Sequence, residues 1–218
     1  MAGSNLTVEF EFRSQRFQDA SQGLRVFYDT LKKDWDGTAK VLSVELRSFL
    51  VSVSQALVQR HSGKWPAGTT DKTLSSRSGG MLKTIVDSVQ VNGGTFSTIQ
   101  GVIGGSAIAA VQEFGATIKP KSASFLTIPL PAALDSNGLP IKKSAREWEN
   151  TFVAKTKKGN LVIFQKRGTA IIPLYVLKTS VTIPPRLGMQ DTLTAGLPYF
   201  VDRAMDRMVK AVLAAQGA

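Results

Sequence analysis

The side chains that do chemistry in proteins are few in this sequence, and their spacing does not suggest a reaction centre. There is no cysteine, which excludes a thiolate nucleophile and a cysteine-type zinc site, and the one histidine, His61, cannot build a histidine metal site alone. The carboxylates of Glu45, Asp87 and Glu113 have no second carboxylate close by in sequence for acid–base work. We therefore expect no catalytic residue, metal site or cofactor, and we expect that the chain is not an enzyme.

A glycine-rich turn, Arg77 to Gly80, precedes a short helix through Met81, Leu82 and Ile85. Such a turn can cradle a phosphate, but no strand precedes this one and no GK[ST] follows it. The sequence favours a structural turn, with Arg77 at an interface. His61 follows a helix end, where a surface or capping role is expected.

Positive charge is concentrated in one segment. The chain has a net charge of +11, and residues 119–186 contain 12 Lys and Arg against 3 Asp and Glu. This charge favours an acidic partner, protein or nucleic acid, although a solvated, solubilising face would read the same. The sequence shows no motif of a specific DNA reader, so any DNA contact would be non-specific and directed at phosphates. The candidate DNA-facing residues are Lys142, Lys143, Lys155, Lys157, Lys158, Lys166 and Arg167.

The stretch from Ala109 to Leu130 is expected to organise the fold. A helix from Ala107 to Phe114 should end at Gly115, where a left-handed stop needs no Cβ. A basic extended arm follows, and then a strand through Phe125 and Leu130 that prolines close.

Three helices are expected elsewhere. A helix is predicted between Arg16 and Lys33, and the apolar spacing predicts another from Trp35 to Val58. A third should begin at Pro198 with its charged residues outward. Its expected inward residues are Phe200, Val201, Ala204, Met208, Val212 and Leu213.

The remaining patterns predict strands. They are Leu6–Phe12, Val86–Val91 with Thr95–Val102 around an Asn-Gly-Gly turn, Thr151–Lys155 with Leu161–Gln165 around a basic tip, and Ala170–Ile183. Residues 61–80 read as a long loop, and residues 119–149 as an extended excursion that Trp148 anchors on its return. The predicted fold is one α+β domain over residues 1–218, with an antiparallel sheet of about five or six strands. One long helix crosses the sheet, and an amphipathic C-terminal helix accompanies it.

The composition is that of a globular protein, with 43% hydrophobic and 20% charged residues. The sequence has no signal-peptide core and no run of about 18 continuous apolar residues. We therefore expect synthesis in the cytoplasm and no membrane contact.

Three pieces of the sequence, in order, carry a resemblance. Residues 113–121 read EFGATIKPK and are followed by FLTIPL at 125–130; RSGGML lies upstream at 77–82 and VTIPPR downstream at 181–186. This order resembles the tail-completion proteins of long-tailed bacteriophages, a family also described as neck, head–tail joining, minor tail or virion-morphogenesis proteins. The sequence departs from the family pattern at Ala116, where a second glycine is usual, and between Pro131 and Trp148.

The resemblance implies a structural virion protein, made in the host bacterial cytoplasm, that assembles as a homo-oligomeric ring at the head–tail junction around the DNA channel. Its partners would be copies of itself, neighbouring neck and tail proteins, and packaged DNA. A tail terminator or tube component is a close alternative, and a non-specific DNA-binding protein is a more distant one. The expected contact residues are Arg77, Glu113, Phe114, Gly115, Lys119, Lys121, Phe125, Trp148 and Arg186.

Overall fold

The computed structural model describes residues 10–12, 15–17 and 19–215, and the chain divides into two compact units. Unit 1 comprises Met1–Phe49, Gln90–Val102 and Leu197–Ala218; unit 2 comprises Leu50–Val89 and Ile103–Gly196. The sequence predicted one domain and gave no sign of two units. Each unit is built from segments that are distant in sequence, so no single boundary along the chain separates them. Most of the expected opening strand, residues 6–9, lies outside the described residues.

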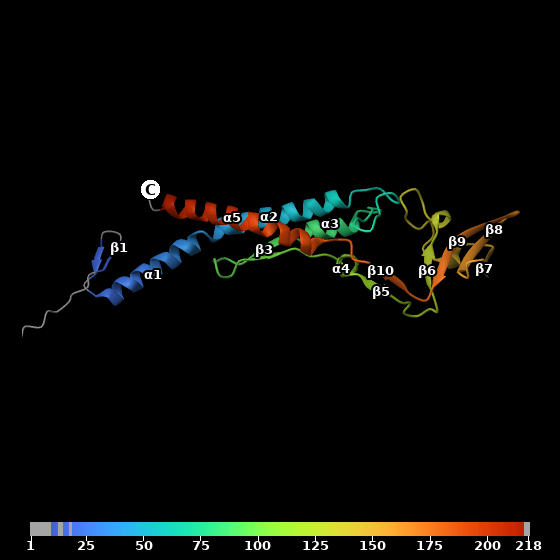
Figure 1. Ribbon diagram of the computed structural model, residues 1–218, viewed down its shortest axis with the longest axis horizontal. Helices are drawn as coiled ribbons and strands as arrows, with labels where there is room; N and C mark the ends of the chain where they lie inside the picture. Colours follow the sequence, from blue (N-terminus) through green and yellow to red (C-terminus); the bar gives the residue numbers. More distant parts are fainter. Residues whose placement is uncertain (1–9, 13–14, 18, 216–218) are drawn as a thin grey trace, which may run out of the picture. The chain divides into compact units, whose positions relative to one another are not determined.

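Unit 1 is mainly helical (Figure 1). It contains the antiparallel pairs β1 (Phe10–Phe12) with β2 (Gln15–Phe17) and β3 (Gln90–Asn92) with β4 (Gln100–Val102), helix α1 (Ala20–Gly37), and parts of α2 (Ala39–Arg60) and α5 (Met189–Ala215). The Asp19 side chain accepts a hydrogen bond of 2.8 Å from the Ser21 backbone N–H, which caps the start of α1.

The boundary between α1 and α2 differs from the prediction. The sequence predicted one helix from Trp35 to Val58, but α1 continues to Gly37 and α2 begins at Ala39. Thr38 separates them: it is buried, and its hydroxyl donates to the Trp35 carbonyl at 2.7 Å. Apolar spacing does not show this break, because the apolar side chains continue on both sides of it.

In unit 1, α5 packs against α2 through both apolar and charged contacts. The rings of Phe49 and Phe200 stack at 5.0 Å between centroids. The buried Glu45 carboxylate accepts from Arg203 Nε at 2.8 Å and from Arg207 Nη1 at 2.6 Å. The charged residues of α5 were expected to face outward; Arg203 and Arg207 are 40% and 51% exposed, but both also bind the buried Glu45 of α2.

The predicted inward face of α5 is confirmed at Ala204 and Met208, which are buried. It is wrong at Val201 and Leu213, which are 46% and 49% exposed. The start of the helix is also corrected. It begins at Met189, and Pro198 lies within it rather than at its first turn.

Unit 2 combines a helical part and an antiparallel sheet (Figure 1). Its sheet has the order β6 (Leu126–Pro129), β9 (Ala170–Lys178), β8 (Leu161–Arg167), β7 (Thr151–Lys155). Its other elements are the rest of α2 and the start of α5, α3 (Gly80–Asp87), α4 (Ala107–Phe114), the pair β5 (Ala116–Ile118) with β10 (Val181–Ile183), and the short helices η1 (Pro131–Ala133) and η2 (Ala145–Glu147). The α+β class is thus confirmed, but the described strands form one four-stranded sheet and three separate pairs.

The excursion predicted at residues 119–149 folds back onto the sheet of unit 2. Trp148 is 8% exposed and packs with Ala133, Leu174 and Tyr175, and its indole N–H donates to the Tyr175 hydroxyl at 3.0 Å. The prediction that Trp148 anchors the return is confirmed. Its prediction as a partner contact is corrected, because its side chain is already buried within its own unit.

One of the two predicted hairpins is confirmed, and the other differs from the prediction. The one joining β7 and β8 is confirmed, with Gly159 at positive φ in its turn. The expected strand Val86–Val91 is wrong over its first half, since α3 continues to Asp87, and residues 93–99 form a loop longer than the expected Asn-Gly-Gly turn.

Among the residues that the structure describes, one helical stretch meets a length-and-composition criterion for crossing a membrane. Ser21–Arg60 contains an 18-residue window with a mean hydropathy of 1.5, of which 28% is buried. Core helices of soluble proteins and signal sequences meet the same criterion. Counting continuous apolar residues did not predict this stretch, because charged residues interrupt it.

Candidate functional site

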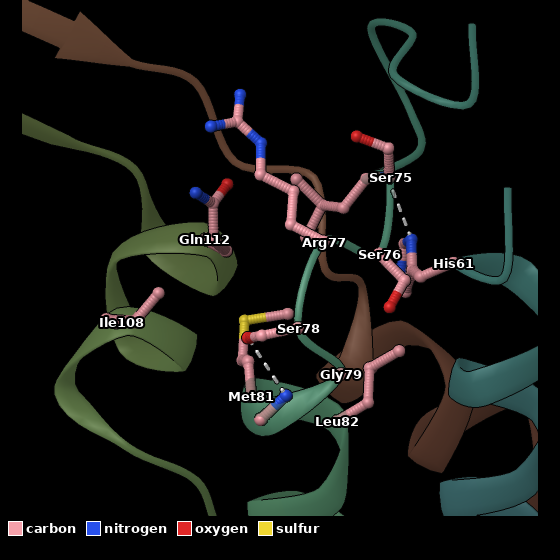
Figure 2. A pocket seen from close by; sticks show the side chains of 12 residues that line it. His61, Ser75, Ser76, Arg77, Ser78, Gly79, Met81, Leu82, Ile108 and Gln112 are labelled. Atoms are coloured by element: carbon pink, nitrogen blue, oxygen red, sulfur yellow. Dashed lines mark hydrogen bonds between the residues drawn. The ribbon is translucent and has the colours of Figure 1, made fainter. Parts of the chain in front are cut away.

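The three sequence pieces that carry the resemblance meet around α4 in unit 2. The piece at 113–121 contributes β5, which pairs with β10 from the piece at 181–186, with Ala116 opposite Ile183. The backbone carbonyl of Gln112 accepts from the N–H groups of Arg186 and Leu187 at 2.6 and 2.9 Å. The piece at 77–82 begins α3 and lies beside α4 across a cavity (Figure 2). The motif order therefore corresponds to a local structural junction.

Glu113 holds the start of α5 at this junction. Its two carboxylate oxygens accept hydrogen bonds of 2.8 Å from the backbone N–H groups of Met189 and Gln190. These are among the N–H groups that a helix leaves without an intrahelical partner at its start, where negative charge is also favourable. Glu113 is thus used within its own chain, whereas its neighbour Phe114 is 73% exposed.

Gly115 makes the turn from α4 into β5 and must be a glycine. Its backbone has φ 72° and ψ 162°, a region that is essentially restricted to glycine. A Cβ there would also lie 3.0 Å from the Ile183 carbonyl oxygen and 3.1 Å from Pro185 Cδ. The helix ends at Gly115 as predicted, but the expected left-handed helical stop is wrong, because ψ is 162° and the chain leaves the helix extended. This turn brings β5 against β10.

Arg77 lies beside a cavity of about 280 Å³ that the segment 75–82 forms with Ile108 and Gln112 of α4 (Figure 2). Its guanidinium donates to the Gly138 carbonyl at 2.9 Å and stands 5.1 Å over the Trp65 ring. Gly79, at φ 71°, precedes α3 without a side-chain cap. Arg77 therefore ties the 61–79 loop to the 131–148 segment, and whether it also contacts a partner stays a prediction.

His61 is a buried structural residue, and the prediction that it lies at the surface or caps a helix is wrong. It is 1% exposed rather than at the surface. Its Nε2 lies 3.0 Å from the Leu187 carbonyl, and its Nδ1 accepts from the Leu74 N–H at 3.0 Å. Because Nδ1 is an acceptor, this pattern fits a neutral ring with its proton on Nε2. His61 thereby joins the end of α2, the 61–79 loop and the chain leading into α5, and nothing in its sequence context signals those partners.

Unit 2 is expected to lose stability in mild acid because of His61. Burial lowers the pKa of His61 below 6.5, the nearby Arg60 lowers it further, and the Leu187 hydrogen bond opposes them. The unfolded chain then binds a proton more readily than the folded chain. The free energy of unfolding is therefore highest above pH about 6.5 and decreases as the pH falls through the lowered pKa of the folded state. Urea unfolding between pH 8 and pH 5 should show this loss.

The control is the variant His61→Gln, which should be less stable at pH 8 but should lose the pH dependence in that window. The comparison is clean because His61 is the only histidine in the chain. Equal pH dependence in the two proteins would contradict the role of His61.

The predicted basic residues do not form one continuous surface. Lys155, Lys157 and Lys158 lie at the β7–β8 turn, whereas Lys166 and Arg167 lie at the β8–β9 turn, at the opposite end of β8. Lys142 and Lys143 line a groove over the sheet. Lys119 and Lys121 are exposed after β5. Phe125 is half-buried and lines the same groove. The buried Nε of Arg186 has no hydrogen-bond partner among the described residues. The arrangement suits separate contacts better than one continuous DNA track.

Unit 1 exposes apolar side chains along two helices. On α5 they recur every four residues beside the buried Ala204 and Met208: Val201, Met205, Val209 and Leu213, each about half exposed. On α1 they are Leu24, Tyr28 and Leu31, with Tyr28 65% exposed. We call the set on α5 the apolar flank of unit 1. Sequence periodicity identified an apolar side of α5 but could not show that part of it lies uncovered.

The described residues contain no group of three or more His, Asp or Glu side chains placed to hold a metal ion. Of the groups that the sequence analysis considered for chemistry, Glu45, Glu113 and His61 hold helices and loops together, whereas Asp87 pairs with the exposed Lys83 of its own helix. Comparison of the chain with protein families, with curated proteins and with solved structures finds no match.

Proposed function

We propose that this chain is a structural subunit of a long-tailed bacteriophage virion, a tail-completion or neck protein that assembles with copies of itself into a ring at the head–tail junction. The observation that supports self-assembly most directly is the apolar flank of unit 1. Exposed contiguous apolar side chains on a folded chain mark interaction sites, because leaving them in water forfeits the free energy of their burial.

The junction around α4 supports the same proposal in a second way. Glu113 and Gly115, which belong to the piece at 113–121, fix the geometry between α4, β5 and the start of α5. A subunit that must repeat identical contacts around a ring needs such a fixed frame. Phe114, held outward between these two residues, is then presented to a neighbouring subunit.

The position at the head–tail junction rests on the order of the three sequence pieces. A ring requires a heterologous contact, in which one surface of a subunit meets a different surface of the next. The apolar flank of unit 1 supplies one of these two surfaces. On assembly it would be covered by a different surface of the next subunit.

The double variant Met205→Lys/Val209→Lys is expected to weaken self-association by at least about tenfold, because it replaces two half-exposed apolar side chains with charges that would be buried at the contact. Light scattering after size exclusion, over a range of concentrations, measures this shift. The matched control is Ser48→Lys/Gln55→Lys, which adds the same charge at exposed polar positions of α2 and should assemble like the parent. A parent chain that stays monomeric at every concentration, or equal masses for the two variants, would contradict the proposal.

A further inference from the structure

A groove of about 500 Å³ lies over one face of the four-stranded sheet in unit 2. Its floor is a row of side chains, one from each strand. Pro129 of β6 pairs with Tyr175 of β9, Tyr175 with Ile163 of β8, and Ile163 with Val153 of β7. Because side chains alternate between the two faces of a strand, paired residues in register point to the same face of the sheet.

The floor of the groove is mostly aliphatic and partly open. Val153 and its neighbour Phe152 are 57% and 41% exposed, and Ile163 is half-buried. Tyr175 is buried and accepts a hydrogen bond from the Trp148 indole. Phe125, from the segment before β6, lines the groove from another side. Such a surface favours an apolar side chain from a ligand, because it removes apolar area from water on both partners.

The rim of the groove is basic. Lys142, Lys143 and Arg146 line it and are exposed, and none of the described residues that line the groove is acidic. The groove therefore has a positive field at its edge over an apolar floor, which is complementary to a ligand carrying both carboxylates and apolar side chains.

The backbone that carries these cations is held by hydrogen bonds within the 131–148 segment. The Ile141 N–H donates to the Ala133 carbonyl at 3.0 Å, and the Ser144 hydroxyl accepts from the Arg146 N–H at 3.2 Å. Trp148 then fixes the end of the segment by packing against Leu174 and Tyr175 of β9. A rim held in this way loses less conformational entropy on binding than a free loop would.

We propose that this groove binds an extended acidic peptide segment of a protein partner. An extended segment points alternate side chains in opposite directions, so apolar side chains can lie on the row from Pro129 to Val153 while neighbouring carboxylates meet the rim. Single-stranded nucleic acid is the alternative occupant, because Phe125 and the exposed Phe152 also line the groove and bases stack on aromatic rings. We favour the peptide because the row in register is mostly aliphatic, and the experiment below distinguishes the two ligands. The inference stands on the groove itself and goes beyond the proposed ring assembly, because it concerns a different unit and a different partner.

Fluorescence anisotropy with a labelled synthetic peptide of alternating glutamate and valine tests the proposal, in about 0.15 M salt so that weak long-range attraction is screened. Lys142→Glu/Lys143→Glu should weaken binding by about tenfold or more, since two charge pairs change sign. The matched control is Lys157→Glu/Lys158→Glu, which makes the same charge change at the β7–β8 turn outside the groove and should alter binding by less than about twofold. A peptide in which serine replaces valine should bind more weakly, because it cannot use the floor.

Three results would overturn the proposal. The first is that no peptide binding is detected up to about 1 mM. The second is that both charge-reversed variants lose the same peptide affinity. The third is that a twelve-nucleotide thymidine strand binds more tightly than the peptide, and that the Lys142→Glu/Lys143→Glu variant loses this binding. The last result would assign the groove to nucleic acid. None of these outcomes depends on whether the chain forms a ring, so failure here is distinguishable from failure of the proposed function.

Discussion

Unit 1 loses about 3 kcal/mol of stability when Arg203→Met and Arg207→Met are combined, if Glu45 has the role that its contacts indicate. The Glu45 side chain is 3% exposed and both of its charged partners come from α5. Removing the two guanidinium groups leaves a buried carboxylate with no compensating charge, which is far more costly than losing a surface ion pair. Urea unfolding together with hydrogen exchange of the α2 amides would measure the loss.

The reverse change, Glu45→Gln, is expected to cost only about 1 kcal/mol, because Arg203 and Arg207 are 40% and 51% exposed and water can solvate them. A triple variant that also replaces Glu45 with Leu should recover much of the stability, since an apolar replacement of all three charges leaves no charge buried. A double arginine variant as stable as Glu45→Gln would contradict this account.

The second large effect is expected for Trp148→Ala in unit 2, at about 3–5 kcal/mol. The indole fills the space between Ala133, Leu174 and Tyr175, and a methyl group would leave a cavity there. Hydrogen exchange should show the loss in the amides of β8 and β9. The segment 131–148 should lose its protection as well, because Trp148 anchors it.

Two conservative variants separate packing from hydrogen bonding at this position. Tyr175→Phe removes only the hydroxyl that accepts from the indole N–H and should cost about 1 kcal/mol. Trp148→Phe keeps part of the packing and should fall between the two. If Trp148→Ala cost no more than Tyr175→Phe, the segment would not depend on the packing that the structure assigns to it.

Local sequence signals predicted the features that depend on neighbouring residues. The stop at Gly115, the β7–β8 turn and the strand closed by Pro129 all follow from backbone preferences within a few residues. The burial of Trp148 was also predictable, because it is the one large aromatic side chain in a polar segment and its burial is what can attach that segment to the fold.

The features that depend on distant partners were not predictable in this way. Glu45 occupies a polar position on its helix by periodicity, and only the arrival of Arg203 and Arg207 from α5 makes it a buried ion-pair site. His61 is likewise buried by Leu74 and Leu187, which lie 13 and 126 residues away. Apolar periodicity also cannot tell which part of an apolar face is covered, so the exposed Val201 and Leu213 were assigned to the core.

The presence of the chain in purified phage particles tests the central proposal most directly. Quantitative mass spectrometry of particles released from cells that carry the gene should find the chain at a fixed, small number of copies per particle. Particles made without the gene should have heads and tails that fail to join. Particles that assemble and join normally without the chain, or that never contain it, would contradict the account.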